Sequence, residues 1–377
     1  MDTTVDLRDP SGAAAPTVAP GRARLGYRRE LDGLRGVAVI LVVVYHVGGV
    51  LWPSARSWLL PGGMFGVDLF FVLSGFLITS LLVGEHDGRG RIDLVGFARR
   101  RLLRLVPAMT GLLAAVLGLA LAGRMYAVDA TLSSAGWALT FTANWAMADD
   151  RPAVMGHLWS VAVEGQFYAM WSIVVVVALR FRRHLGVVAA IAATGVAAVA
   201  WWRYVEMGRG ANLFHVYMGT FTRLDAPLVG ALAGVAVASG SVDRLRGRAA
   251  SLVSAVGLVV VVVAAFTLGP FEPVLYRGAF TLVAGAGACA VVGAVRAGDG
   301  VLVRALGARP LVLAGMVSYS LYLWHLPIFD WLERATPGWS PVVRSVVGVV
   351  AAVAVSTVSY LYVERPFLRR RHRRAAA

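Results

Sequence analysis

The chain is 377 residues long, 58% of its residues are apolar, and its mean hydropathy is +0.70. Only 15% of the residues are charged, whereas soluble domains are about 45–50% apolar and about a quarter charged. This composition excludes a disordered chain and disfavours an ordinary soluble enzyme. The formal charge of +15 comes from 36 basic residues, all of them Arg. Because these residues lie between apolar stretches, they indicate membrane topology, and we expect no nucleic-acid partner.

Ten apolar stretches follow one another, each close to the roughly 20 residues that a membrane-spanning helix needs. We therefore predict an all-α membrane protein, a bundle of about ten transmembrane helices, with a flexible tail at 1–27, a membrane domain at 28–366 and a basic tail at 367–377. The tail at 1–27 contains no short apolar segment that would indicate a signal peptide. Segment 132–147 is apolar but short, so we expect a re-entrant or interfacial piece. The predicted spans are 34–52, 66–84, 102–122, 157–180, 185–204, 221–239, 251–269, 275–296, 311–333 and 342–362.

The distribution of Arg residues gives the bundle an orientation. The loops and tails on one side of ten spans carry 26 Arg, and the loops on the other side carry eight. Positively charged loops remain on the cytoplasmic side of a membrane. We therefore predict that both termini are cytoplasmic.

The first predicted span contains Arg35 and His46, which are eleven residues apart. Eleven residues at about 100° each make three turns plus about 20°, so both side chains face the same way, about 16 Å apart along the axis. Ionisable groups within a membrane are costly and indicate functional sites. This stripe suits an elongated ligand with an anionic head and a reactive tail, and an imidazole can act as a general base. The alternative is an Arg that reaches the membrane surface and a His that hydrogen-bonds a neighbouring helix.

A second polar group begins the fourth predicted span, in the run HLWSVAVEGQFY. His157, Ser160, Glu164 and Tyr168 lie at positions i, i+3, i+7 and i+11, which share one helical face. A carboxylate in the membrane needs a partner, and His157 is on the same face, two turns away. We predict that His157 and Glu164 are catalytic, with Glu164 orienting the imidazole of the first span or the acceptor. The alternative is a helix cap followed by interfacial aromatic residues.

Arg100, Arg101 and Arg104 form a cationic cluster at the cytoplasmic start of the third predicted span, in FARRRLLRLVPA. Anchoring at the inner membrane face or binding of anionic lipids explains such a run. The alternative is a phosphate clamp, since guanidinium groups bind phosphate in bidentate pairs. The presence of Arg35 favours the clamp, so we predict that these four Arg residues bind the anionic part of a ligand.

Several weaker candidates remain. Asp68 begins the second span, where it can also act as a helix cap. Arg223 and Asp225 can pair with each other, and Glu364 is typical of a charge at a helix end in a basic anchor. The run SYSLYLWH, residues 318–325, is typical of an aromatic belt near the outer end of the ninth span, although its His can bind an acceptor. The residues for which we predict substrate binding are Asp68, Trp159, Tyr168, Asn144 and His325.

Familiar metal-binding and nucleotide-binding patterns are absent from the sequence. It contains no HExxH, no Cys/His zinc spacing, no GxxxxGK[ST] and no GxSxG. The single cysteine, Cys289, excludes an intramolecular disulfide and lies in the middle of a predicted span, where a packing role is expected. We predict that the site holds no metal.

Six segments in order resemble the integral-membrane acyltransferase-3 family, which includes bacterial O-acyltransferases of cell-surface sugars and of macrolide antibiotics. The resemblance runs from about Glu30 to Pro366, nearly the whole chain. The matching segments are ELDGLRG with the Arg35-x10-His46 spacing, GVDLFFVLSGFLI, ARRRLLRLVPA, HLWSVAVEGQFY, SYSLYLWH and VERP.

The resemblance implies transfer of an acyl group, commonly acetyl, from a coenzyme A thioester to a hydroxyl. It implies that the Arg-x10-His and Arg-Arg-x-x-Arg motifs are essential, and these are here Arg35, His46, Arg100, Arg101 and Arg104. The family's glutamate in WS-x-x-x-E corresponds to Glu164, and Gly165 stands where many relatives have a second acidic residue. Many relatives continue into an SGNH-hydrolase-like domain, whereas we expect the stand-alone form here.

We therefore expect a membrane-bound O-acyltransferase of the bacterial plasma membrane, surrounded by lipids, with acyl-CoA, in particular acetyl-CoA, as the donor. The Arg residues would hold the phosphates, and His46 would act as a general base or take the acyl group itself. The acceptor would be a hydroxyl of a sugar, a surface-glycan precursor or a macrolide-type metabolite. The alternative is a proton-coupled transporter or flippase in which His46 and Glu164 relay protons.

Overall fold

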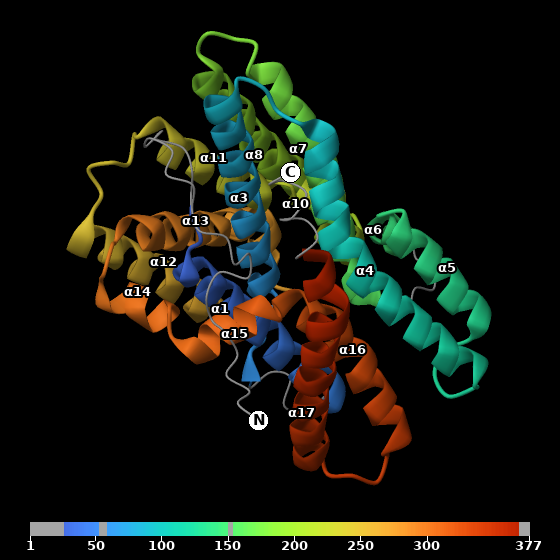
Figure 1. The fold of residues 1–377 in the computed structure, drawn as a ribbon. Helices are drawn as coiled ribbons and strands as arrows, with labels where there is room; N and C mark the ends of the chain where they lie inside the picture. The colour runs from blue at the N-terminus through green and yellow to red at the C-terminus, as the bar shows by residue number, and fades with distance from the viewer. Residues whose placement is uncertain (1–25, 53–58, 150–153, 369–377) are drawn as a thin grey trace.

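The computed structural model describes residues 26–52, 59–149 and 154–368. These residues form helices and connecting loops, and no strand occurs among them (Figure 1). Short π-helical segments, Val47–Leu51, Leu275–Ala279 and Tyr360–Glu364, continue or precede longer helices, and a 3₁₀ turn, Gly156–Leu158, leads into α7. The helices are α1 Arg29–His46, α3 Phe65–Arg89, α4 Leu94–Leu121, α5 Val128–Leu139, α6 Ala143–Ala148, α7 Trp159–Ala178, α8 His184–Gly208, α9 Leu213–Met218, α10 Thr220–Arg223, α11 Asp225–Ser239, α12 Gly247–Thr267, α13 Phe280–Arg296, α14 Val301–Leu306, α15 Arg309–Met316, α16 Ser318–Ala335 and α17 Pro341–Ser359.

The predicted all-α membrane bundle is confirmed. Eight helices of the described chain are long and apolar enough to cross a membrane, and α15 with α16 forms a ninth, bent span. The remaining predicted span, 221–239, corresponds to α11, which has only 15 residues. Segment 132–147, predicted to be too short to span, is divided between α5 and α6. The cytoplasmic position of the termini stays a prediction, and the predicted tails at 1–27 and 367–377 lie almost entirely outside the described residues.

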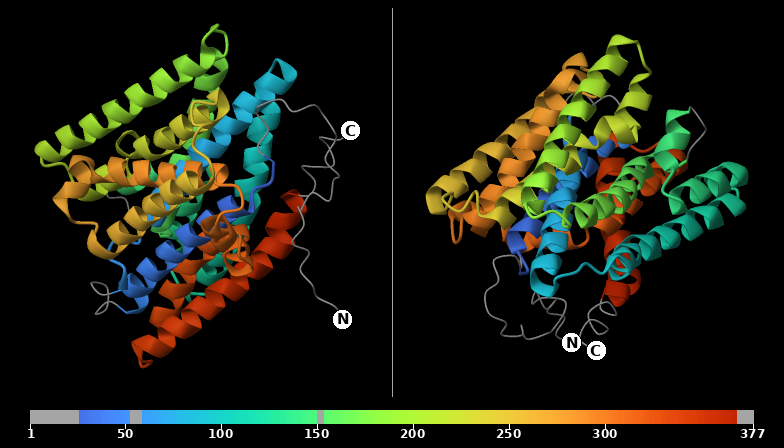
Figure 2. Two further views of the ribbon diagram at one scale, coloured as in Figure 1. Left: turned by 90° about the vertical axis from the view of Figure 1, so that its left-hand side faces the viewer. Right: turned by 90° about the horizontal axis from the view of Figure 1, so that it is seen from above.

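Helix α3 is the centre of the bundle, and other helices form its lipid-facing periphery. In the most apolar window of α3, 78% of the residues are buried, compared with 17% in α8. Helix α8 runs along the edge of the molecule (Figure 2). Large apolar side chains are exposed on α12 and α17, for example Val259 and Val350. In a bilayer such side chains contact lipid tails, so an apolar exterior needs no further partner.

Two glycines allow α1 to approach α15 very closely. A Cβ added at Gly36 would lie 2.3 Å from the carbonyl oxygen of Leu311, and one at Gly315 would lie 1.8 Å from that of Asp32. Only glycine fits at such contacts, which are typical of helix pairs in membranes. Gly36, the second glycine in LDGLRG, is therefore explained by packing, and the contact brings the neighbouring Arg35 next to the start of α16.

The ninth span is bent by 71° at Val317, between α15 and α16. The bend turns the polar start of α16 into the protein interior. Ser318, Tyr319, Tyr322 and His325 are all buried there. The run SYSLYLWH is therefore an interior segment, and the interpretation as an aromatic belt at the membrane surface is wrong.

Candidate functional site

Two cavities lie next to each other in the centre of the bundle. The first, which we call the arginine cavity, includes about 680 Å³ of empty space with its open mouth. It is formed by α1, α3, α4, α7 and α16, and its polar lining residues are Arg35, Ser74, Arg101, Arg104, Ser160, Glu164, Tyr168, Ser318, Tyr319 and Tyr322. Three guanidinium groups and one carboxylate give this cavity an excess of positive charge, so it suits an anionic ligand.

The guanidinium groups of the arginine cavity are held mainly by uncharged groups. Both Nε and Nη2 of Arg35 donate to Ser318 Oγ, at 3.3 and 3.1 Å. The guanidinium carbon of Arg101 lies 5.4 Å from the centre of the Tyr168 ring. Among the described residues, Arg35, Arg101 and Arg104 form no ion pair with a carboxylate. Their positive charges therefore remain available to an incoming anion.

Glu164 belongs to the arginine cavity and not to the histidines. Its Oε1 accepts hydrogen bonds from the hydroxyls of Ser74 and Tyr168. His157 instead bonds to Leu323 and lines the second cavity. Seven residues carry a helix about 10 Å along its axis, which is enough to separate the two side chains into different cavities. We predicted that Glu164 orients an imidazole with the help of His157. The structure places Glu164 in one cavity and both His46 and His157 in the other, so it does not bring these residues together.

Arg100 is separated from the other Arg residues of its cluster. It forms an ion pair with Glu85 at 3.3 Å, its side chain is 31% exposed, and it does not line the arginine cavity. Consecutive residues point about 100° apart around a helix, so Arg100 and Arg101 face different surroundings. The predicted group of four Arg residues is reduced to Arg35, Arg101 and Arg104.

The second cavity, which we call the histidine cavity, includes about 1030 Å³ of empty space with its mouth. Among the described residues its lining holds two histidines and many aromatic rings but no Arg, Asp or Glu. Its imidazole and aromatic lining residues are Tyr45, His46, His157, Trp159, Phe214, Tyr217, Phe271, Tyr276 and Tyr322. A chemically reactive imidazole thus faces a roomy and mainly apolar space.

His325 contacts both histidines of this cavity, although it does not line the cavity itself. His46 Nδ1 lies 2.9 Å from the carbonyl oxygen of Val42 and 3.3 Å from Nε2 of His325. The ring centres of His157 and His325 are 5.5 Å apart. A carbonyl oxygen only accepts hydrogen bonds, so we assign the Nδ1 proton of His46 to the contact with Val42. This assignment leaves the lone pair of His46 on Nε2, as a general base requires.

The start of α7 places His157 in this group. Met155, just before the 3₁₀ turn, adopts a left-handed conformation with φ +62°. Such a conformation is unfavourable for a residue with a side chain, and here it turns the chain sharply into the helix. His157 Nε2 then lies 3.0 Å from the carbonyl oxygen of Leu323, which ties α7 to α16.

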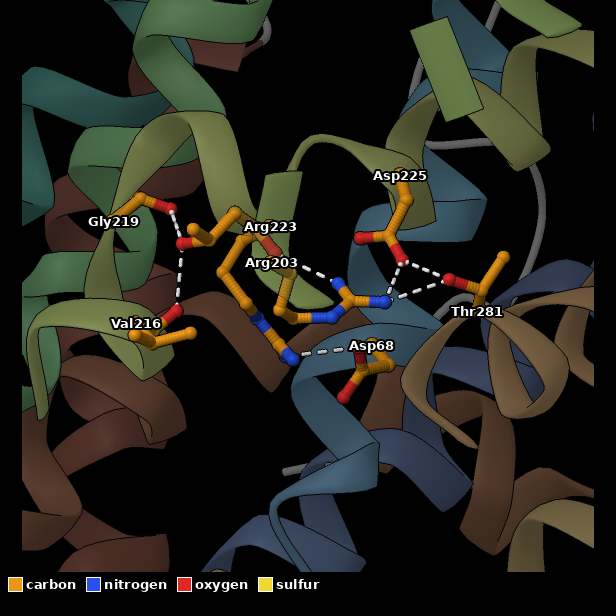
Figure 3. A network of polar contacts seen from close by, with 8 residues as sticks. Asp68, Arg203, Val216, Gly219, Arg223, Asp225 and Thr281 are labelled. Carbon is orange, nitrogen blue, oxygen red and sulfur yellow. Dashed lines mark hydrogen bonds and ion pairs between the residues drawn. The ribbon is translucent and has the colours of Figure 1, made fainter. Parts of the chain in front are cut away.

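Asp68, predicted to bind substrate, is part of a buried ion-pair network instead (Figure 3). It pairs with Arg223 at 2.9 Å, while Asp225 pairs with Arg203 at 2.9 Å. Arg223 and Asp225 therefore form ion pairs with other residues and not with each other, as their spacing had allowed. The Arg203 guanidinium also donates to Thr281 Oγ1 at 2.7 Å. These bonds join α3, α8, α10, α11 and α13, which assigns Asp68 a structural position.

Asn144 is also held within the protein. It is buried, its Nδ2 donates to Thr220 Oγ1 at 2.9 Å and to the Met218 carbonyl oxygen at 3.3 Å, and its Oδ1 accepts from Gln166. These bonds join α6 to α7 and to the segment of α9 and α10. Asn144 lines neither cavity, whereas two other predicted substrate residues do: Tyr168 lines the arginine cavity and Trp159 the histidine cavity.

Several residues of the site were not predicted. Ser74 and Ser318 bind Glu164 and Arg35, and Tyr322 lies between the two cavities. Glu364, predicted as an anchoring charge at a helix end, is buried and accepts from Ser320 Oγ at 3.0 Å. The run SYSLYLWH contained a signal, since its polar residues Ser318 and Tyr322, at i and i+4, share one face of a helix.

Among the described residues, no group of three His, Cys, Asp or Glu side chains has the arrangement of a metal site. The arrangement supplies a cavity with three cationic side chains, which suits an anion, and next to it an imidazole, which is able to act as a base. These two elements together suit a reaction between an anionic cosubstrate and a second, uncharged substrate.

Comparison with known proteins shows the family. A family model described as an acyltransferase domain matches residues 28–361. The O-acetyltransferase OatA of Staphylococcus aureus is 29% identical over 353 residues, which are 90% of this chain and 57% of the relative. The putative peptidoglycan O-acetyltransferase YrhL of Bacillus subtilis is 29% identical over 355 residues, 90% of this chain and 55% of the relative.

The peptidoglycan O-acetyltransferase OatA of Listeria monocytogenes is 28% identical over 368 residues, 90% of this chain and 56% of the relative. The chain thus spans little more than half the length of these curated relatives. No solved structure matches the chain significantly. With eight or more apolar helices and a family match over most of its length, the chain belongs to the integral-membrane acyltransferase-3 family and is a multi-pass membrane protein.

Proposed function

We propose that this protein is an O-acyltransferase of the plasma membrane that moves an acetyl group from acetyl-CoA to a hydroxyl acceptor. The observation that carries the proposal is the placement of three cationic side chains in one cavity and of the His46 imidazole in the adjoining one. The names of the relatives, which are O-acetyltransferases, support the same reaction class.

The arginine cavity supports acyl-CoA as the donor. Coenzyme A carries its negative charges on phosphates at one end and the thioester at the other. Arg35, Arg101 and Arg104 offer guanidinium groups that form no ion pair with a carboxylate among the described residues, and such groups match phosphate oxygens geometrically. By the predicted topology these residues lie toward the cytoplasm, where acetyl-CoA is available.

His46 supports general-base chemistry at the acceptor. Its Nε2 takes the proton of the acceptor hydroxyl while the hydroxyl oxygen bonds to the thioester carbonyl carbon. The tetrahedral intermediate then collapses, the C–S bond breaks, and the proton passes to the departing thiolate sulfur. The products are an ester and free coenzyme A, and no further reactant is needed.

The histidine cavity supports the acceptor. Its aromatic rings can stack against a sugar ring or another ring-shaped hydroxyl compound. We include surface glycans, their precursors and macrolide-type natural products as acceptors, since each of them supplies the same hydroxyl chemistry.

The test uses the full chain in lipid nanodiscs with acetyl-CoA and, in separate reactions, a muropeptide disaccharide and a macrolide. Release of free thiol and the mass of the acceptor are measured. We expect acceptor-dependent thiol release and an acetylated product, with kcat lowered by about 10²–10⁴-fold in His46→Ala. The matched control is His184→Ala, because His184 lies outside both cavities at the start of α8.

Two results would contradict the proposal. Wild-type rates of acetyl transfer in His46→Ala would exclude the imidazole as the base. A pH-gradient-driven flux of substrate without any consumption of acetyl-CoA would favour the transporter alternative.

A further inference from the structure

Tyr322 stands in the wall between the two cavities. Tyr322 and Val67 are the two described residues that line both of them. On one side the Tyr322 ring contacts Phe70, a residue of the arginine cavity, with ring centres 6.5 Å apart. On the other side it lies 5.6 Å from the ring of His157, a residue of the histidine cavity. The aromatic ring of Tyr322 is therefore the larger part of the partition.

Hydrogen bonds hold this ring in place. The Tyr322 hydroxyl donates to the carbonyl oxygen of His157 at 2.7 Å and lies 2.6 Å from Ser160 Oγ. The partners lie in the 3₁₀ turn before α7 and in the first turn of α7, so these bonds close the partition between α16 and this segment. The side chain of Val67, on α3, has no polar atom and is shorter. Of these two residues, Tyr322 is the one whose side chain is held by hydrogen bonds, and such bonds can break and re-form.

The proposed reaction requires this partition to open. The acceptor oxygen near His46 must bond to the carbonyl carbon of a thioester whose anionic end is held in the arginine cavity. Bonding atoms must come into contact, whereas Tyr322 separates the two spaces in the structure. A closed partition also keeps the water of the histidine cavity away from the thioester. Water that reached the thioester would hydrolyse it to acetate and free coenzyme A.

We propose that Tyr322 is a gate between the arginine cavity and the histidine cavity, closed by its bonds to His157 and Ser160 and opened by rotation of its side chain. The role of the gate in catalysis rests on the proposed function. The existence of the gate does not, because it concerns only whether a small molecule can pass from one cavity to the other.

The first experiment tests passage without any enzymatic turnover. The exposed thiol Cys289 is replaced by serine. A second substitution, Val161→Cys, places a single thiol in the arginine cavity, because Val161 lines that cavity and does not line the histidine cavity. Right-side-out vesicles receive 2-sulfonatoethyl methanethiosulfonate, an anion that does not cross lipid and suits a cationic cavity. By the predicted topology the arginine cavity opens toward the cytoplasm, so a reagent outside the vesicle reaches this thiol through the histidine cavity, and the labelling rate reports how often the gate is open.

We expect slow labelling with Tyr322 present. Tyr322→Phe keeps the ring but loses both bonds of the hydroxyl, so labelling should rise about tenfold, the factor expected from hydrogen bonds of ordinary strength. Tyr322→Ala removes the partition and should label faster still. The matched control is Tyr319→Phe, because Tyr319 lies one turn away, lines only the arginine cavity and bonds to the Leu105 carbonyl oxygen. Labelling in this control should not change.

Equal labelling rates in the parent, Tyr322→Phe and Tyr322→Ala proteins would overturn the gate, provided that each is monodisperse and keeps its helical circular dichroism. If Tyr322→Ala does not fold, Tyr322→Phe alone decides the result.

The second experiment measures thiol release from acetyl-CoA without an acceptor. We expect Tyr322→Ala to hydrolyse acetyl-CoA about tenfold or more faster than the wild type, because water gains access to the thioester. Faster labelling without any reaction of acetyl-CoA in the wild type or its variants would establish the gate and contradict the proposed function. Unchanged labelling with normal acetyl transfer would contradict the gate alone.

Discussion

The Nε2 atom of His325 lies 3.3 Å from Nδ1 of His46 and joins α16 to α1 at the histidine cavity. His325 Nδ1 lies 3.1 Å from the carbonyl oxygen of Leu321, so we assign the proton of His325 to that nitrogen and an acceptor role to its Nε2. The Nδ1 proton of His46 is then shared between Val42 and His325. A residue 279 positions away thus fixes the tautomer and the direction of the His46 ring.

The first prediction concerns His325, which we assign as a positioning residue for His46. His325→Ala should lower kcat by about 10–100-fold, the usual cost of losing a group that orients a ligating or catalytic imidazole. The KM for acetyl-CoA should not change, because His325 does not line the arginine cavity. His325→Gln should restore part of kcat, since its amide oxygen can accept the same proton. Steady-state kinetics measures both constants, and a change confined to KM would contradict the role.

The second prediction separates the Arg residues of α4. Arg104→Ala should weaken coenzyme A binding by about 10–100-fold, as expected for loss of hydrogen bonds between charged groups. Arg100→Ala should change binding by less than about fivefold, because it removes only a partly exposed ion pair with Glu85. Isothermal titration of the protein in nanodiscs with coenzyme A compares the two. Equal effects of both substitutions would show that the cluster acts as a unit at the membrane face.

The third prediction concerns the buried pair of Asp68 and Arg223. Asp68→Ala leaves the guanidinium of Arg223 buried without its partner, which should destabilise the protein by about 3–5 kcal/mol. A double change, Asp68→Leu with Arg223→Met, should cost less than Asp68→Ala alone, because no unpaired charge remains. Thermal unfolding followed by circular dichroism measures the order of the variants.

Its control is Arg209→Ala. Arg209 pairs with Glu206 at 3.4 Å, and its side chain is 66% exposed, so its loss should barely change the unfolding temperature. A double variant that is less stable than Asp68→Ala would show that the ion pair contributes net stability beyond avoiding an orphaned charge.

Hydropathy predicted the spans well because each span must by itself cross the bilayer, with apolar side chains outside and all backbone hydrogen bonds made within the helix. The helix α11 was placed correctly although it is short. The bend between α15 and α16 was not predicted, because the hydropathy of a bent span does not differ from that of a straight one. That bend moves the predicted belt residues into the site.

Partners across helices could not be derived from spacing along one helix. Arg223 and Asp225 are two residues apart, and a pairing between them was one interpretation of the sequence. Positions two apart do not face each other on a helix, and in the structure Arg223 meets Asp68 and Arg203 meets Asp225. Glu164 and His157 share a face but differ in depth, which places them in different cavities.

The sequence by itself determined that this is a helical membrane protein and that Arg35 and His46 share one face of the first span, because hydropathy and helical periodicity are local properties. It also supplied the segments that resemble the family. Only the tertiary structure decided that Arg100 is excluded from the arginine cavity, that Asp68 is a structural residue, that Tyr322 belongs to the site, and that His325 contacts His46. These facts depend on which helices pack together, and in a membrane that is set by close contacts between helices rather than by hydrophobicity, which all spans have in common.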